Sequence, residues 1–437
     1  MVLFVTGIFF YYGRLFINGG KWATHPSNSH LYSDGRLLRA GDITDRRGTV
    51  LASTRDCQRH FNENYYTRVA TAHTVGDLEG FVSTGIHSAF LPELTGYDVI
   101  NGTYNESGKG NDITLTIDSD LCVTALRSLG NRAGTVGVCN YKTGEIICMV
   151  SSYTFDPEEK STLDEQKEGV YVNRLLSGQY TPGSVFKLVT CLSALENFSD
   201  FSERKYTCQR GVTLSNEWLS CLSNHGTLGI KDGLAQSCNA VFSQVALDVG
   251  KTALTNTANE IGFNKALYMD GIKCAESKFD VSSAPDIDLG WAGIGQYNDI
   301  ANPYQYMRFM AAVANGGVSV SPHVVKSITS PDGTEIRGES SSEQRLISAD
   351  SAKVLKEYMR NNVKTTYGDY SFPGLELCAK TGTAEVGENA TPHSWFVGFS
   401  DLPEKPYAFV VVAENAGSGL GVASSIASRV LRAAGSV

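Results

Sequence analysis

Two residues of this 437-residue chain could act together as a nucleophile and its base. Ser184 and Lys187 stand three positions apart at the start of an apolar run with the three-and-four spacing of a helix. A helix can begin just after Pro182 and Gly183, so the serine falls in its first turn and the lysine on the same face. A serine hydroxyl needs an adjacent base, and burial lowers the pKa of a lysine enough for it to serve. The N–H groups at such a helix start could also stabilise an oxyanion.

The Ser-x-x-Lys pattern is weak by itself, because the chain contains it twice. The second copy, Ser202–Lys205, lies in a charged segment that is typical of solvated surface. Taken alone, the Ser184 pair would be interpreted as a helix start with a surface lysine. Two motifs further along the chain change that interpretation.

Ser237-Cys238-Asn239 places a hydroxyl and a carboxamide two positions apart, after a short helical stretch. Both side chains could face one cleft from a helix-to-loop bend. The hydroxyl could relay a proton to a leaving group, and the amide could hold a substrate carbonyl. Alone, this triplet is usually surface polarity.

The third motif consists of Lys380, Thr381, Gly382 and Thr383, at the end of a predicted strand. The lysine supplies positive charge, the two hydroxyls could bind a carboxylate, and the glycine would let a substrate backbone approach closely. A second Lys-Thr-Gly at Lys142–Gly144 lies in a predicted hairpin turn, where these residue types are ordinary, and we reject it.

Strands from two distant parts of the chain are expected to position these groups. A hairpin is predicted at 134–150, helical patterns dominate from about 184 to 265, and an amphipathic helix closes the chain at 423–434. Each strand is too short to be stable alone, so we expect one antiparallel sheet and an α+β fold. The later strands of that sheet are predicted at 375–383, 394–399 and 407–413.

The N-terminal part is predicted to be separate. A polar segment at 101–111 marks a boundary, and a turn at Asp45–Gly48 separates two short extended pieces whose charges we interpret as structural. Residues 1–17 are apolar but fall short of the roughly 20 residues that a spanning helix needs. They are either the outer part of a membrane anchor whose first residues lie outside this sequence or an N-terminal element of the fold.

Composition narrows the function classes. With 42% hydrophobic and 19% charged residues the chain is predicted to fold, and a net charge of −9 argues against a nucleic-acid partner. The ten cysteines show no Cys-x-x-Cys spacing, so no metal site and no cofactor is expected. Cys208 and Cys221 flank a loop, where a disulfide and a pair of free thiols are about equally expected.

Ser-x-x-Lys, Ser-x-Asn and Lys-Thr-Gly, in that order, resemble the motifs of the penicillin-binding proteins. Arg39–Ala52 is similar to the signature that opens the non-catalytic pedestal of class B members, so the resemblance extends over about residues 39–435. Tyr297 departs from the pattern, since relatives commonly carry glycine there. Further segments resemble the family at Asn173-Arg174, His225-Gly226, Gly293–Gln296 and His393–Gly398.

The resemblance implies a fold, a division of the chain and a location. The fold would be a five-stranded antiparallel sheet flanked by helices, with a helical subdomain and a small N-terminal pedestal domain. The resemblance favours the truncated-anchor interpretation, with a single N-terminal plasma-membrane anchor and an extracytoplasmic catalytic domain. The expected divisions are an anchor at 1–17, a pedestal at 18–112 and a transpeptidase domain at 113–437.

The resemblance also implies an activity and partners. The chain would be a peptidoglycan D,D-transpeptidase of the bacterial cell wall that cross-links stem peptides ending in D-Ala-D-Ala and is inhibited by β-lactams. A membrane-embedded glycosyltransferase is the expected partner. Two alternatives stay open: a β-lactam-hydrolysing or sensing protein on the same domain, and a non-catalytic scaffold of a wall-synthesis complex.

Each motif residue receives an implied role in acyl transfer. Ser184 would be the nucleophile and Lys187 its base, while Ser237 and Lys380 would pass a proton to the departing D-alanine. Asn239 would position the donor peptide, Thr381 and Thr383 would bind its terminal carboxylate, and Gly382 would let the substrate backbone approach closely. The backbone N–H groups of Ser184 and Thr383 would form the oxyanion hole.

Overall fold

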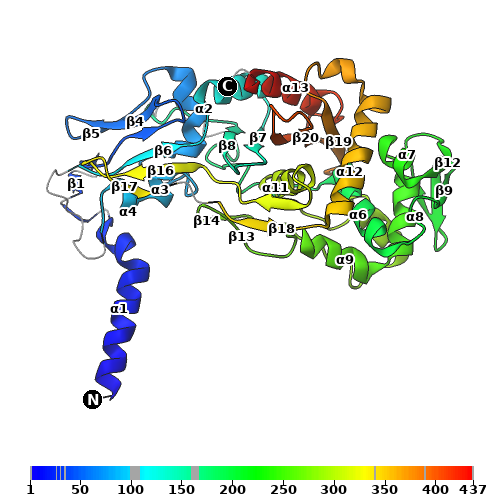
Figure 1. Cartoon of the computed structure of the whole chain (residues 1–437), viewed down its shortest axis with the longest axis horizontal. Helices are drawn as coiled ribbons and strands as arrows, with labels where there is room; N and C mark the ends of the chain where they lie inside the picture. The colour runs from blue at the N-terminus through cyan, green and yellow to red at the C-terminus, as the bar shows by residue number, and fades with distance from the viewer. Residues whose placement is uncertain are drawn as a thin grey trace. The chain divides into compact units, whose positions relative to one another are not determined.

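The computed structural model describes residues 2–25, 27–29, 31–33, 36–98, 109–158, 167–338, 341–387 and 390–435. The chain, traced from blue to red in Figure 1, forms two compact units. The first comprises Met1–Val123, Thr154–Tyr171 and His323–Ser340, and the second comprises Thr124–Tyr153, Val172–Pro322 and Ser341–Val437. Of the predicted boundary segment at 101–111, residues 101–108 lie outside the described residues.

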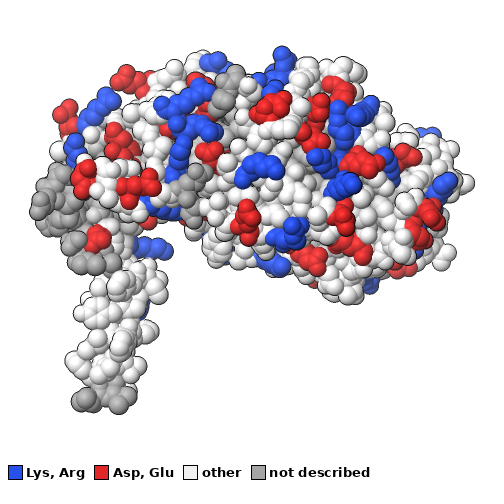
Figure 2. Space-filling model, viewed as in Figure 1, with Lys and Arg blue, Asp and Glu red and all other residues white. Residues whose placement is uncertain are grey.

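The first unit begins with helix α1 (Val2–Ala23), which extends beyond the predicted 1–17 segment. Its apolar side chains are largely exposed, Leu3 and Ile17 among them, and Figure 2 shows the helix almost without charge. Within the described ranges, none of the helices combines the length and apolar character that crossing a membrane requires.

A six-stranded sheet forms the body of the first unit. Asp45 organises its first turn, because its buried carboxylate accepts from the backbone N–H groups of Arg47 and Thr49, and from the hydroxyl of Ser119. Gly48 ends this turn at a φ of 84°, so the predicted turn and its structural charges are confirmed. The strand order is β17 (Glu335–Arg337), β16 (Val325–Thr329), β6 (Asp112–Leu115), β3 (Ile43–Thr44), β4 (Val50–Arg55), β5 (Gln58–Phe61).

The smaller elements of the first unit are helices and one short hairpin. They are α2 (Tyr65–Val75), α3 (Ile86–Ala89), α4 (Leu91–Leu94) and the pair β1 (Tyr32–Ser33) and β2 (Arg36–Leu37). Helix α5 (Ser119–Leu129) leads from the first unit into the second.

The second unit is built on a five-stranded antiparallel sheet, as predicted. Its strands come from both ends of the region, and Tyr407–Ala413 pairs along its whole length with Gly134–Asn140. Because strands this short are stable only together, the two distant segments hold each other in register. The strand order is β19 (Leu377–Ala384), β20 (His393–Ser400), β21 (Tyr407–Ala413), β7 (Gly134–Asn140), β8 (Ile146–Ser152).

Helices cover this sheet. Both α11 (Pro303–Ala314) and α13 (Val422–Ala434) contact β21, and every residue of β21 is buried, so both faces of the sheet are covered. The other helices of this unit are α6 (Lys187–Asn197), α7 (Ile230–Ala235), α8 (Asn239–Val249), α9 (Lys251–Glu260), α10 (Asp286–Ala292) and α12 (Ala349–Asn362).

The prediction that helical patterns dominate from 184 to 265 is only partly right. Two small two-stranded sheets occupy much of the stretch between α6 and α7. One of them is a hairpin, in which Ser215 and Asn216 adopt φ values of 45° and 71°, as its tight turn requires. The two-stranded sheets of the second unit are β9 (Lys205–Cys208) with β12 (Gly226–Gly229), β10 (Gly211–Leu214) with β11 (Glu217–Ser220), β13 (Leu267–Met269) with β14 (Ile272–Cys274), and β15 (Val318–Val320) with β18 (Glu343–Arg345).

Candidate active site

Ser184 lies in a tight 3₁₀ turn, Gly183–Val185, immediately before α6, and its side chain is partly exposed. Gly183 has a φ of 56°, and a Cβ there would stand 2.5 Å from the carbonyl oxygen of Thr383. Only glycine allows strand β19 to run this close to the serine turn. The sequence prediction of a helix start is therefore right in its essentials, with a 3₁₀ turn in place of the first α-helical turn.

Lys187, the first residue of α6, is completely buried. Its Nζ lies 2.9 Å from Ser184 Oγ, 2.7 Å from the carbonyl oxygen of Ser237 and 2.7 Å from Asn239 Oδ1. No carboxylate is among these partners, so the lysine has hydrogen-bond acceptors without a counter-ion. This is the environment in which a lysine gives up its proton most readily.

Ser237 connects the two lysines of the motifs. It has a φ of 51°, which turns its hydroxyl toward both, at 3.3 Å from Lys187 Nζ and 2.9 Å from Lys380 Nζ. Lys380, on β19, is also completely buried and donates a second hydrogen bond to the carbonyl oxygen of Thr381. A chain of hydroxyl and amine groups thus runs from Ser184 to Lys380.

Burial is the main cause of the lowered pKa values of the two lysines. It lowers the pKa of Lys187 to about 7, against the opposing effect of the nearby Cys238 and Cys221 sulfurs. Burial, and then the charge of Lys187, lowers the pKa of Lys380 well below its usual range. Near neutral pH, Lys187 is therefore available as a proton acceptor for Ser184.

Asn239 begins α8, and its side chain is held from both ends. Its oxygen accepts from Lys187, and its nitrogen donates to the carbonyl oxygen of Ser220 at 3.2 Å. The amide therefore has a fixed orientation, which suits a group that positions a ligand.

The remaining residues of the strand motif have different surroundings. Thr383 is exposed, whereas both the backbone N–H and the hydroxyl of Thr381 bond to the phenol oxygen of Tyr367 at 3.2 Å. Gly382 is buried, and a Cβ there would stand 2.9 Å from Trp395 Cβ and 3.0 Å from the Pro182 carbonyl oxygen. Its missing side chain therefore serves the packing of β19 within the protein.

Two functional candidates were not predicted from the sequence. Tyr367 ends a five-residue π-helix, Val363–Tyr367, and no sequence signal marks it as a partner of Thr381. Gln296 belongs to a segment quoted for the family resemblance, and its Nε2 donates to the Thr383 carbonyl oxygen at 3.2 Å. These two residues hold β19 on either side of Gly382.

Hydrogen bonds of residues outside the three motifs also hold the segment that leads into the serine turn. Arg174 and Tyr180 both bond to Glu414 Oε1, at 2.7 and 2.9 Å, and the Trp395 indole donates to the carbonyl oxygen of Thr181 at 3.1 Å. Arg174 and Trp395 lie in segments quoted for the resemblance, so part of that similarity reflects support of the turn.

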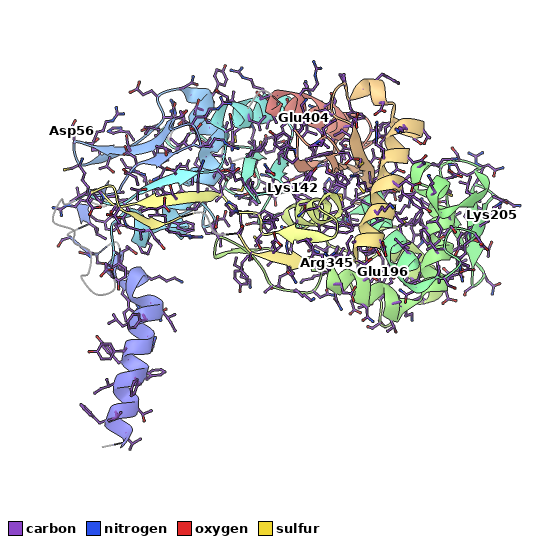
Figure 3. The ribbon with its side chains drawn as sticks, viewed as in Figure 1. Asp56, Lys142, Glu196, Lys205, Arg345 and Glu404 are labelled. Carbon is purple, nitrogen blue, oxygen red and sulfur yellow. The ribbon has the colours of Figure 1, made fainter. Side chains whose placement is uncertain are left out.

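The rejected motif copies lie on the surface. Ser202 and Lys205 are both exposed, and Lys205 begins β9. Lys142 is exposed and donates to Asn315 Oδ1. Figure 3 labels both lysines, each on a different element from the catalytic candidates.

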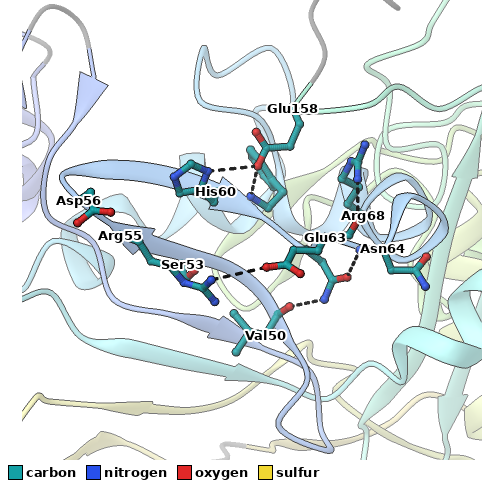
Figure 4. A pocket seen from close by; sticks show the side chains of 11 residues that line it. Val50, Ser53, Arg55, Asp56, His60, Glu63, Asn64, Arg68 and Glu158 are labelled. Atoms are coloured by element: carbon teal, nitrogen blue, oxygen red, sulfur yellow. Dashed lines mark hydrogen bonds and ion pairs between the residues drawn. The ribbon is translucent and has the colours of Figure 1, made fainter.

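A pocket of about 1120 Å³ in the first unit offers a different kind of site (Figure 4). Its charged groups contact one another: Arg55 lies 3.7 Å from Glu63, and Glu158 Oε1 accepts from the Phe61 N–H and lies 3.9 Å from His60. Paired, partly exposed charges of this kind stabilise little and activate no nucleophile. The candidate active site is therefore the one in the second unit.

Comparisons with known proteins bear on this site. The family profile described as Penicillin binding protein transpeptidase domain matches residues 134–432. The chain is 26% identical over 440 residues to the peptidoglycan D,D-transpeptidase PbpA of Mycolicibacterium smegmatis, covering 90% of this chain and 88% of the relative. It is 28% identical over 331 residues to PbpA of Mycobacterium tuberculosis, covering 69% and 67%.

Solved structures agree in fold. The D,D-transpeptidase domain of a peptidoglycan glycosyltransferase from Eggerthella lenta has a TM-score of 0.78 at 25% identity, covering 90% of this chain and 97% of that one. A ceftriaxone acyl-enzyme complex of penicillin-binding protein A from M. tuberculosis has a TM-score of 0.80 at 24% identity, covering 91% and 98%.

Proposed function

The chain belongs to the penicillin-binding protein transpeptidase family, and from this premise we propose that it is a peptidoglycan D,D-transpeptidase acting through a Ser184 acyl-enzyme. One observation carries the proposal: the buried Lys187 Nζ lies 2.9 Å from Ser184 Oγ and has no carboxylate among its hydrogen-bond partners. A neutral lysine so placed can take the serine proton as the oxygen attacks a carbonyl.

The first half of the reaction forms an ester. Ser184 Oγ attacks the carbonyl of a D-Ala-D-Ala terminus, and its proton passes to Lys187. The N–H groups of Ser184 and Thr383 stabilise the oxyanion, since the close approach at Gly183 brings the serine turn against β19. The C–N bond then breaks, and the leaving amine takes a proton through Ser237, whose hydroxyl bridges Lys187 and Lys380.

The second half of the reaction reverses the roles. An amine from a second stem peptide attacks the ester, gives its proton back through Lys187, and releases Ser184. A β-lactam would follow only the first half, since its leaving group stays attached to the acyl chain and blocks the acceptor. The same site then accounts for cross-linking and for inhibition.

Binding of the donor peptide falls to the strand motif and Asn239. Thr381 and Thr383 receive the terminal carboxylate, whose charge would raise the pKa of the nearby Lys380 and restore a protonated lysine when substrate is bound. Asn239, already fixed through Lys187 and Ser220, holds the peptide on the opposite side.

We also propose a location and partners from the same premise. The exposed apolar side chains of α1 support attachment to the plasma membrane, with the second unit extracytoplasmic where peptidoglycan is assembled. The first unit then serves as a pedestal, and a membrane-embedded glycosyltransferase supplies the glycan strands. Along the sequence the proposed divisions are an anchor at 1–17, a pedestal at 18–112 and a transpeptidase domain at 113–437; the first unit includes that pedestal range and adds to it residues up to Val123, Thr154–Tyr171 and His323–Ser340.

One experiment separates this function from its two alternatives. The purified chain is incubated with a pentapeptide donor and an amine acceptor, and cross-linked product and released D-alanine are measured with and without penicillin. We expect product formation that penicillin blocks. Sustained hydrolysis of a chromogenic β-lactam without cross-linking would indicate a hydrolase, and neither acylation nor turnover would indicate a scaffold.

A further inference from the structure

Four potential metal ligands meet at the Ser237–Asn239 motif. The pairing of β9 with β12 and of β10 with β11, together with the start of α8, brings them together. All four ligand atoms lie within 4.8 Å of one another. We refer to them as the Cys₃His cluster, which consists of Cys208, Cys221, His225 and Cys238.

Each ligand lies at or near the end of a different strand or helix. Cys208 ends β9, Cys221 follows β11, and His225 precedes β12. Cys238 is the N-cap residue of α8 and the middle residue of the Ser-x-Asn triplet. With twelve, three and twelve residues between successive ligands, the cluster has no short sequence signature, and the expectation of no metal site did not take it into account.

Three of the six separations between ligand atoms are close to those of a tetrahedral metal site. His225 Nδ1 lies 3.5 Å from both Cys208 Sγ and Cys221 Sγ, and Cys221 Sγ lies 3.9 Å from Cys238 Sγ. Zinc at its usual bond lengths of about 2.3 Å to sulfur and 2.0–2.1 Å to nitrogen would separate its ligand atoms by roughly 3.5–3.8 Å. A disulfide would require about 2.05 Å, and all ten cysteines are free in the structure.

Backbone groups around the cluster suit thiolate ligands. The backbone amides of Asn239 and Ala240 hydrogen-bond to Cys221, and that of Val241 to Cys238, at the N-terminal turn of α8. Such bonds orient metal-bound sulfurs and offset part of their charge. Three of the four ligands are also buried, which excludes competing water.

We propose that the Cys₃His cluster binds one Zn²⁺ ion as a structural site. Three thiolates and one imidazole form a four-coordinate set without an open position, and soft sulfur ligands favour zinc over magnesium or calcium. Binding displaces the thiol protons of the three cysteines, so affinity falls as the pH is lowered.

The position of the cluster gives the ion a consequence for the active site. Cys238 is covalently flanked by Ser237 and Asn239, both of which contact Lys187 Nζ. An ion that links Cys238 to the ligands of the β9–β12 and β10–β11 pairs would therefore fix the strained Ser237 backbone and the orientation of the Ser237 and Asn239 side chains. The site is proposed independently of the activity, whereas this consequence rests on the proposed function.

The test begins with the wild-type full-length chain, purified without a polyhistidine tag and without added chelator. We expect elemental analysis to find about one zinc per chain, as a closed structural site retains its metal. After chelation, added Co²⁺ should give the thiolate charge-transfer and intense d–d absorption of a tetrahedral sulfur-rich site. Less than about 0.1 zinc per chain together with no such cobalt spectrum would overturn the proposal.

Matched variants identify the ligands. Cys208→Ser should lose the bound zinc, whereas Cys274→Ser, which alters a buried cysteine outside the cluster, should retain it. Equal zinc content in both variants would contradict the assignment. If Cys208→Ser fails to fold, the wild-type metal content and cobalt spectrum still decide. A disulfide between two cluster cysteines, found by mass spectrometry in metal-free protein that is fully folded, would show instead that the cluster is a redox pair.

Discussion

The Ser-x-x-Lys pattern occurs at Ser184 and again at Ser202, and the two copies lie in different surroundings. In the first, Lys187 is completely buried and its Nζ lies 2.9 Å from the serine oxygen. In the second, Ser202 and Lys205 are both exposed to solvent. The same contrast holds for Lys-Thr-Gly, since Lys380 is buried beside Ser237 and Lys142 is exposed in a hairpin turn.

The comparison teaches that burial, more than residue type, makes these groups reactive. An exposed lysine keeps its proton at neutral pH and cannot act as a base. Burial without a carboxylate partner lowers the pKa of Lys187 to about 7.

The largest difference is expected between the two serines. Ser184→Ala should lower the rate of acylation by penicillin by on the order of 10⁴-fold or more, because Ser184 Oγ lies closer to Lys187 Nζ, at 2.9 Å, than Ser237 Oγ does, at 3.3 Å. Ser202→Ala should leave the rate unchanged. Stopped-flow measurement with a fluorescent penicillin makes the comparison, and residual acylation of Ser184→Ala within tenfold of wild type would break it.

The two lysines of the Lys-Thr-Gly copies should differ next. Lys380→Ala should slow acylation by about two orders of magnitude, the usual loss when a group that stabilises transition-state charge is removed. Lys142→Ala should remain near wild type, because Lys142 is exposed and donates to Asn315 Oδ1. The same labelling assay measures both, and equal effects would mean that burial does not distinguish them.

The rate should also depend on pH in a direction set by Lys187. Its neutral form is the base, so the acylation rate should rise about tenfold per pH unit below pH 7 and level off above it. Rates measured between about pH 5 and 9, with circular dichroism to verify folding, test this. A rate that stays constant below pH 7, or that falls as the pH rises toward 7, would show that Lys187 is not the base.

The smallest effect is expected at Tyr367, which holds Thr381. Tyr367→Phe removes the partner of two Thr381 hydrogen bonds and should raise KM for the donor peptide several-fold, about 1 kcal/mol, with kcat nearly unchanged. Tyr141→Phe is the matched control, because that buried phenol donates to the carbonyl oxygen of Ser400, which ends β20 opposite Leu377 of β19. Identical KM values for the two variants would remove Tyr367 from the site.

The sequence predicted those parts of the molecule that depend on local pattern. The hairpin at 134–150 and the strands at 394–399 and 407–413 were predicted, and their need for partners predicted a single sheet. The order of the three motifs identified Ser184, Lys187, Ser237 and Lys380, which the structure brings into one hydrogen-bonded chain.

The features that the sequence did not predict depend on contacts between distant segments. The paired strands between α6 and α7 are short, and polar residues obscure their alternation of apolar and polar positions. Tyr367 contacts Thr381 from a π-helix. Gly382 was expected to let a substrate backbone approach closely, whereas in the structure Trp395 and Pro182 occupy the space that a side chain at this position would take. The ligands of the Cys₃His cluster lie far apart in the sequence and are brought together by the pairing of β9 with β12 and of β10 with β11 and by the start of α8.

The location of the covalent adduct decides whether Ser184 is the nucleophile. Wild-type protein is acylated with penicillin, digested, and analysed by tandem mass spectrometry. We expect one adduct per chain, on the peptide that contains Gly183–Lys187, with the acyl group on Ser184. An adduct on Ser237 or Ser202, or no covalent adduct on a folded chain, would contradict this assignment of the nucleophile.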